Sequence, residues 1–144
     1  MSSTSTYLNF TNQTEEAFNF YKSVFGGEFE PPIGRFRDIP PAPDVSPPDE
    51  ATGNLIMHIC LPILGGHKLM GTDAPESMGF TVNQGNNVHI SLHPDSRSET
   101  ERIFSGLMAD GTITLPLQEM FWGAYYGTGR DKYGIHWMVN YEGA

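Results

Sequence analysis

The chain has 144 residues, a length typical of one domain that buries a core without metal ions or disulfide bonds. Its 17 acidic and 8 basic side chains give a net charge of −9 at pH 7, which disfavours nucleic acids and anionic membranes as partners. No segment approaches the roughly 18 consecutive apolar residues that a membrane span requires. We therefore expect residues 1–144 to form one folded domain with neither a nucleic-acid nor a membrane partner.

Cysteine usage and the first residues bear on the cellular location. Cys60 is the only cysteine, so the chain has no intrachain disulfide, and a thiol on a buried strand is expected to be inert. The opening residues MSSTSTYLNF contain neither the basic nor the apolar region of a secretory signal. These features predict a cytoplasmic protein.

The first 27 residues predict a strand followed by a helix. Residues 7–10 are expected to end a short strand. Thr14 is a suitable helix N-cap, and the acidic residues after it complement the helix dipole. Apolar residues at helical spacing give the helix a face to bury, and Gly26 and Gly27 end it.

A weak repeat places the same pattern in the second half of the chain. An offset of 84 positions pairs Leu8 with Leu92, Thr14 with Ser98, Glu15 with Glu99, Phe20 with Phe104, and Gly27 with Gly111. The second copy therefore predicts a strand over 87–92 and a helix over 99–108 that is capped by Ser98.

Strand-forming sequence follows each predicted helix. The expected strands are 29–39, 54–61 and 67–71 in the first half, and 112–117, 121–127 and 134–141 in the second. Each half thus reads as one strand, one helix and three strands, with module 1 at about 5–75 and module 2 at about 86–143. Gly65 and Gly66 suit a hairpin turn.

A proline-rich segment interrupts the strands of the first module. Residues 38–53 hold five prolines between Pro40 and Pro48, which lack backbone donors and disfavour both helix and sheet. We predict a mobile loop there. A role as a lid over a cavity stays open, because most such loops are connectors.

Two stretches of the sequence resemble a known family. YLNFTNQTEEAFNFYKSVFGGEF and LPLQEMFWGAYYGTGRDKYGIHWMVNY are similar to the PhnB-like branch of the glyoxalase, bleomycin-resistance and dioxygenase proteins, the vicinal oxygen chelate superfamily. The resemblance implies an α+β fold in which paired βαβββ modules form a curved, partly open, eight-stranded barrel-like sheet around a cavity. It also implies a homodimer.

Members of this branch have been labelled demethylubiquinone methyltransferases, and the sequence disfavours that activity. A methyltransferase of the common kind binds its cofactor at a glycine-rich turn between a strand and a helix. Gly26 and Gly27 end a helix instead of opening one, and no other glycine pair follows a strand and opens a helix.

The resemblance also raises the question of a metal ion. In metal-using relatives such as glyoxalase I, four His, Gln or Glu side chains from the first and last strands of each module hold a divalent ion. Here His89 stands at such a position, but Ser5 is its counterpart in module 1, and Met138 occupies the place of a glutamate. His136 lies two residues before Met138 on the same face, and His67 is the candidate from module 1. We predict no cofactor, with a divalent metal as the less favoured alternative.

The aromatic stretches FWGAYYG and YGIHWMVNY suggest a binding cavity. If 121–127 is a strand, rings stand on both of its faces. In the last strand, Trp137 and Val139 alternate with His136, Met138 and Asn140, a mixed set typical of a cavity wall. The cavity candidates are His58, His89, Phe121, Trp122, Tyr125, His136, Trp137 and Met138, and no catalytic residue is assigned.

Three functions remain open at this point. The first is a metal-independent protein that binds a small, partly aromatic or amphiphilic molecule. The second is a metal-dependent lyase, isomerase or dioxygenase that uses His89 with His136, His58 or Glu119. The third is a dimeric structural or regulatory protein whose rings serve only packing, since strand histidines and tryptophans are common in cores.

Overall fold

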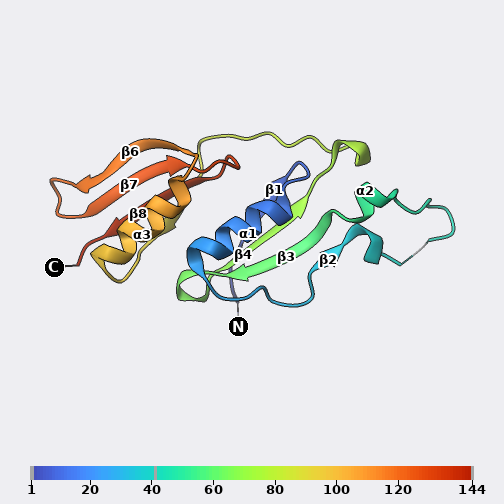
Figure 1. Ribbon diagram of the computed structural model, residues 1–144, viewed down its shortest axis with the longest axis horizontal. Helices are drawn as coiled ribbons and strands as arrows, with labels where there is room; N and C mark the ends of the chain where they lie inside the picture. Colours follow the sequence, from blue (N-terminus) through green and yellow to red (C-terminus); the bar gives the residue numbers. More distant parts are fainter. Residues whose placement is uncertain (1, 41, 144) are drawn as a thin grey trace. The chain divides into compact units, whose positions relative to one another are not determined.

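The computed structural model describes residues 2–40 and 42–143 of the chain; Pro41, within the proline-rich segment, lies outside them. The chain divides into two compact units, Met1–Asn83 and Gln84–Ala144 (Figure 1). Each unit contains a four-stranded sheet, and one longer helix packs against it. No helix in the described part of the chain is both long and apolar enough to cross a membrane.

The first unit follows the order predicted for module 1. Its main elements are β1 (Thr6–Phe10), α1 (Thr14–Phe25), β2 (Gly34–Arg35), β3 (Ile56–Pro62) and β4 (Lys68–Asp73). The strand order is β1-β4-β3-β2, in which β1 runs parallel to β4 and the other pairs are antiparallel. Short helical segments are η1 (Phe36–Asp38), α2 (Glu50–Gly53), η2 (Leu64–Gly66) and η3 (Glu76–Met78).

The second unit repeats this topology. Its elements are β5 (Ile90–Leu92), α3 (Arg97–Met108), β6 (Thr112–Glu119), β7 (Tyr125–Arg130) and β8 (His136–Tyr141). The strand order is β5-β8-β7-β6, and β5 runs parallel to β8. The predicted α+β class and the paired βαβββ modules are confirmed, and the eight strands of the described residues belong to two four-stranded sheets.

Each sheet has one face covered by the helix of its own unit. In unit 1, Phe18 and Tyr21 of α1 are buried against the sheet, together with Leu69 of β4. The fit is close, because a Cβ atom on Gly71 would lie 2.5 Å from Cε1 of Phe18. We call the opposite side of each sheet, which its own helix does not cover, the open face.

Two strand predictions differ from the structure. Of the range 29–39 only Gly34–Arg35 is a strand, because prolines precede it and η1 follows it directly. Of the range 121–127, residues 121–123 form the turn between β6 and β7, where Gly123 has a φ of 98°. The strand β7 begins only at Tyr125.

The helix starts also differ in detail from the sequence prediction. Thr14 is the first residue of α1, and Gln13 is its N-cap without a side-chain bond. The cap of α3 is Ser96, two residues before the predicted Ser98, and its Oγ accepts from the backbone N–H of Glu99 at 3.1 Å. Within the segment predicted as a loop, Asp49 caps the single turn of α2.

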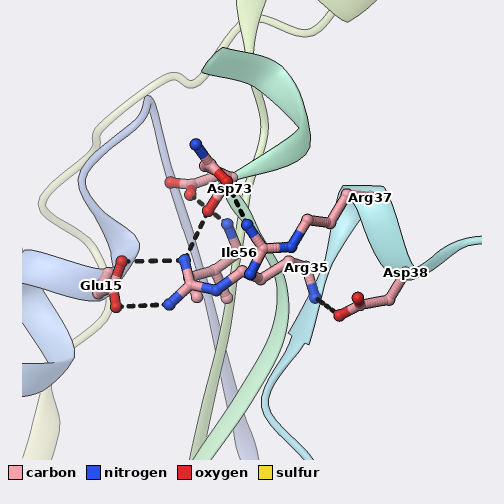
Figure 2. Close-up of polar contacts among 7 residues, drawn as sticks. Glu15, Arg35, Arg37, Asp38, Ile56 and Asp73 are labelled. Atoms are coloured by element: carbon pink, nitrogen blue, oxygen red, sulfur yellow. Dashed lines mark hydrogen bonds and ion pairs between the residues drawn. The ribbon is translucent and has the colours of Figure 1, made fainter. Parts of the chain in front are cut away.

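Thr14 is no cap because its hydroxyl group binds a buried carboxylate. Asp73, at the end of β4, accepts from the Thr14 N–H at 3.0 Å, from the Thr14 hydroxyl at 2.7 Å and from the Ile56 N–H at 2.8 Å. These bonds join the start of α1 to β3 and β4. Figure 2 shows Asp73 beside Ile56. The carboxylate thus replaces the side-chain cap that the sequence predicted.

An exposed ion pair beside Asp73 ties α1 to β2. The guanidinium group of Arg35 donates to both carboxylate oxygens of Glu15, at 3.0 and 2.7 Å, and to the Asn54 carbonyl at 2.6 Å. Asp38 accepts from the Arg35 N–H at 2.9 Å, and Arg37 contacts the Asn54 side chain (Figure 2). The hydrogen bond from Arg35 is the main cause that lowers the pKa of Glu15.

This ion pair makes the stability of the protein depend on pH. Because the pKa of Glu15 is lowered in the folded state, the stabilisation is complete above the ordinary glutamate pKa of about 4.3 and is lost as the pH falls below it. With 54% of the Glu15 side chain exposed, we expect Glu15→Gln to cost only about 0.5 kcal/mol at neutral pH. Urea denaturation of both proteins over a pH series measures the difference. A difference that stays constant from neutral to acidic pH contradicts this account.

Candidate functional site

The open face of the second sheet carries an unusual mixture of side chains. Directly opposite residues of neighbouring strands share a face, and the register pairs Thr128 with Met138 and Arg130 with His136. In β8 the alternation of half-buried His136 and Met138 with buried residues confirms the pattern predicted from YGIHWMVNY. Tyr126 of β7 stands on the same face.

Five side chains of this unit form a continuous strip. Trp122 packs edge-on against Tyr126 with ring centroids 6.0 Å apart, and the Tyr126 hydroxyl lies 3.7 Å from Sδ of Met138. His89, which precedes β5, has its ring centroid 5.2 Å from that of His136. We call these residues, Trp122, Tyr126, Met138, His136 and His89, the open-face strip. It runs from an aromatic and thioether end to an imidazole end.

A polar hollow adjoins the imidazole end of the strip. Its volume is about 500 Å³, and its lining consists of Gln84, Gly85, Asn86, Thr112, Thr114, Arg130 and His136. None of these residues is acidic, although the chain carries an excess of nine negative charges. The lining therefore presents hydroxyl, amide, imidazole and guanidinium groups to a molecule bound in the hollow.

A buried carboxylate fixes this geometry from the other side of the sheet. Asp131 is 2% exposed and accepts from the Tyr133 N–H at 2.8 Å, the Ile135 N–H at 3.1 Å and Nε1 of Trp137 at 2.8 Å. It therefore locks the turn that sets β7 against β8. The sequence gives no sign of this burial, because Asp131 stands between Arg130 and Lys132 in a charged triplet.

Three of the predicted cavity residues lie elsewhere in the second unit. Trp137 is fully buried beneath α3 and belongs to the core. Tyr125 faces the helix side, where its hydroxyl donates to Glu101 at 3.0 Å and the Arg97 guanidinium lies 3.8 Å above its ring. Phe121 is in the turn and is 98% exposed. Phe121 and Tyr125 were grouped because strand 121–127 was predicted to start four residues too early, whereas Trp137 lies on the covered face of β8.

His58 lies in the first unit, on the open face of that sheet. Its Nδ1 is 3.0 Å from the hydroxyl of Tyr7, so its partner is a side chain of the same sheet. Burial raises the pKa of the Tyr7 hydroxyl. Beside this pair, Cys60 is a buried free thiol whose pKa burial raises, as expected for an inert cysteine.

Glu119 does not join the histidine pair of the second unit. It ends β6 and forms an ion pair with Arg97 at 2.8 Å. Thr112, at the start of the same strand, lies opposite Arg130 beside His136. At about 3.3 Å per residue the two ends of β6 are roughly 20 Å apart. Glu119 is therefore no general base for chemistry at His136.

The side chains at the expected ligand positions do not fit a divalent metal ion. In unit 1 the hydroxyl of Ser5 lies 3.7 Å from Sδ of Met70, and His67 is engaged instead by the Thr6 hydroxyl at 2.8 Å. The open faces present Tyr7 and Met70 in unit 1, and Met138 beside the His89 and His136 pair in unit 2. Phenol and thioether groups are poor ligands for the hard or borderline ions that these folds bind. Among the described residues no group of three or more His, Cys, Asp or Glu side chains is gathered for a metal ion.

Two further hollows lie in the first unit. The larger, of about 740 Å³, is lined mainly by the proline-rich segment, from Phe36 to Thr52, together with Ser77 and Met78. The smaller, of about 310 Å³, lies beside Asp73 and Glu15, whose carboxylates already have partners. Neither hollow contains a histidine, and the first is mostly apolar.

The fold and the site define the class of protein. A glyoxylase/bleomycin resistance protein/dioxygenase domain from Frankia sp. EAN1pec matches this chain with a TM-score of 0.66, over 99% of this chain and 98% of that one, at 13% identity, which shows the shared fold. More particularly, residues 2–140 match the sequence model of the family described as 3-demethylubiquinone-9 3-methyltransferase, and the chain belongs to that family.

Individual relatives agree with this assignment. Protein PA1353 from Pseudomonas aeruginosa is 32% identical with a TM-score of 0.82, over 99% of this chain and 98% of that one. The PhnB protein from Bacillus cereus is 26% identical with a TM-score of 0.73, over 97% and 99%. Protein YjdN of Escherichia coli is 28% identical over 94% of this chain and 92% of its own length. The resemblance to the PhnB-like branch is thus confirmed.

Replacing the Asp131 carboxylate tests its structural role. In Asp131→Asn an amide N–H₂ group faces one of three buried donors, so we expect a loss of about 2–4 kcal/mol in the free energy of unfolding. Urea denaturation followed by the fluorescence of the two tryptophans measures it. The matched control is Asp110→Asn, an exposed residue at a φ of 60° that asparagine also adopts, with an expected change within about 0.5 kcal/mol. Equal stability of both variants contradicts this role.

Proposed function

We propose that this protein binds a small, partly aromatic or amphiphilic molecule on the open face of its second sheet, without a metal ion. The observation that carries the proposal is the contact of Trp122, Tyr126 and Met138 in the open-face strip, whose opposite end reaches a polar hollow of about 500 Å³ at His136. Ligand pockets of this size combine apolar walls with a few polar groups that orient the ligand. A thioether beside an aromatic ring adapts to flat molecules of varied shape.

The composition of the strip favours binding over packing alone. Side chains that serve only a core are covered, as Trp137 and Val139 are on the helix side. His136, Met138 and Tyr126 are only half-buried in the structure, and Trp122 is 51% exposed. A row of partly exposed rings and a thioether is a surface that a flat apolar molecule covers favourably.

Metal-dependent chemistry and methyl transfer are not part of this proposal. The phenol and thioether groups at the ligand positions argue for metal-independent binding. The methyl transfer in the family description calls for a doubly wound parallel sheet, whereas each sheet here contains a single parallel pair. The buried free thiol of Cys60 accords with the expected cytoplasmic location.

A thermal-shift screen of small aromatic molecules tests the binding proposal. A ligand at a hundred times its dissociation constant adds about 2.7 kcal/mol of stability. Met138→Ala removes an apolar contact from the strip, so we expect it to weaken every hit about fivefold to tenfold. The matched control is Met78→Ala, which makes the same change in the hollow of the first unit. The proposal fails if no aromatic binds, or if Met78→Ala weakens the hits as much as Met138→Ala.

We also propose that the chain forms a homodimer through the turn between β6 and β7. Phe121 is 98% exposed there and stacks edge-on against Trp122, with ring centroids 5.0 Å apart. Exposed neighbouring rings of this kind are typical anchors of protein interfaces.

Light scattering coupled to gel filtration tests the homodimer. We expect about 32 kDa, twice the chain mass of 16.0 kDa, and a shift toward 16.0 kDa in Phe121→Ser. Phe80→Ser, which removes an exposed ring from the first unit, is the control and should leave the mass unchanged. A wild-type mass of 16.0 kDa at high protein concentration would falsify the dimer.

A further inference from the structure

We infer that the ligand of the open-face strip is an organic anion whose carboxylate or phosphate group is held by Arg130 and His136; this inference rests on the proposed function and names its ligand class. The polar hollow lies at one end of the strip, and both residues belong to its lining. Either oxyanion accepts several hydrogen bonds from groups of this kind.

The donors form one row across the four strands of the second sheet. Thr112 of β6 lies opposite Arg130 of β7, and Arg130 lies opposite His136 of β8. The His136 ring is tilted against that of His89, next to β5, with centroids 5.2 Å apart. Neighbouring strands are about 4.8 Å apart, so the row spans roughly 14 Å on a single face. It offers a hydroxyl, a guanidinium and two imidazole groups at one level of the sheet.

Arg130 differs from most basic residues of this acidic chain. Ion pairs with carboxylates engage Lys22, Arg35, Lys68, Arg97 and Arg102. Within the described residues, the guanidinium group of Arg130 has no carboxylate at ion-pair distance. The neighbouring carboxylate of Asp131 is buried and accepts three hydrogen bonds of its own. The positive charge beside the hollow is thus available to an incoming anion.

The rest of the strip defines the other end of the ligand. Met138 lies two residues from His136 along β8, which is about 7 Å, and Tyr126 is in contact with Met138. A molecule that reaches both ends therefore joins a flat apolar body to a terminal oxyanion. A neutral aromatic would fill the apolar end and leave the guanidinium group without a partner.

A series of probes that share one ring system separates the contribution of the anionic group to binding from that of the aromatic ring. We would measure the dissociation constants of 2-naphthoate, 2-naphthamide and 2-naphthyl phosphate by calorimetry at low salt. Arg130→Gln is expected to weaken both anionic probes at least about tenfold and to leave 2-naphthamide unchanged. Arg130→Lys keeps the charge but loses the two-pronged geometry, so it should recover part of the loss.

The control variant is Lys132→Gln. It removes the same charge two residues away on an exposed turn, and we expect the affinity for 2-naphthoate to stay within about threefold. If Lys132→Gln weakens 2-naphthoate as much as Arg130→Gln does, the effect is one of net charge and the inference is overturned. The order of 2-naphthoate and 2-naphthyl phosphate identifies which oxyanion fits better, and tighter binding of either than of 2-naphthamide supports the inference.

Failure of the inference and failure of the proposed function give different results. Equal binding of 2-naphthoate and 2-naphthamide, unaffected by Arg130→Gln, overturns the anion and leaves the aromatic site standing. In the reverse case the oxyanion binds and the ring does not: inorganic phosphate shifts the side-chain NMR resonances of Arg130 and His136, and no naphthalene probe binds. That result supports the oxyanion site and overturns the aromatic one. Absence of all binding overturns both.

Discussion

The three hydrogen bonds of the buried Asp131 carboxylate hold the second unit in register, and the composition of both faces of its sheet follows from that register. The bonds close the turn between β7 and β8 and anchor the Trp137 indole beneath α3. A slip by one residue would bring Met138 under the helix and turn Trp137 outward. The side chains that face outward are therefore as strictly determined as those of the core.

Both units use a buried carboxylate, at different places. Asp73 joins the start of α1 to two strands of the first unit, whereas Asp131 acts within a single turn of the second. In the described residues every buried side-chain nitrogen or oxygen atom has a hydrogen-bond partner. On the open face of the first sheet His58 is paired with Tyr7, and Glu30 with Lys68. Arg130 on the open face of the second sheet has no such carboxylate partner among the described residues, which favours an anionic group in the ligand.

Sequence periodicity predicted the two modules and the outward set of β8, because alternation and helical spacing are local properties of the chain. Periodicity did not predict features that tertiary contacts determine. Thr14 was predicted as a helix N-cap because its buried partner Asp73 lies 59 residues away, and the turn at 121–123 was predicted as strand because it is aromatic. Tyr126 was missed because alternation separates the two faces of a strand without showing which one the helix covers, and Tyr125 was chosen instead. Strand composition alone does not reveal where a hairpin turns.

The claim that a flat apolar molecule lies on the open face of the second sheet is tested most directly by where such a molecule sits. Nuclear Overhauser effects between 2-naphthoate and carbon-13 labelled methionine methyl groups locate it, with Met138→Leu to assign the signal. The account predicts contacts to the Met138 methyl group and the Tyr126 ring. Contacts confined to Met78, in the apolar hollow of the first unit, would contradict it.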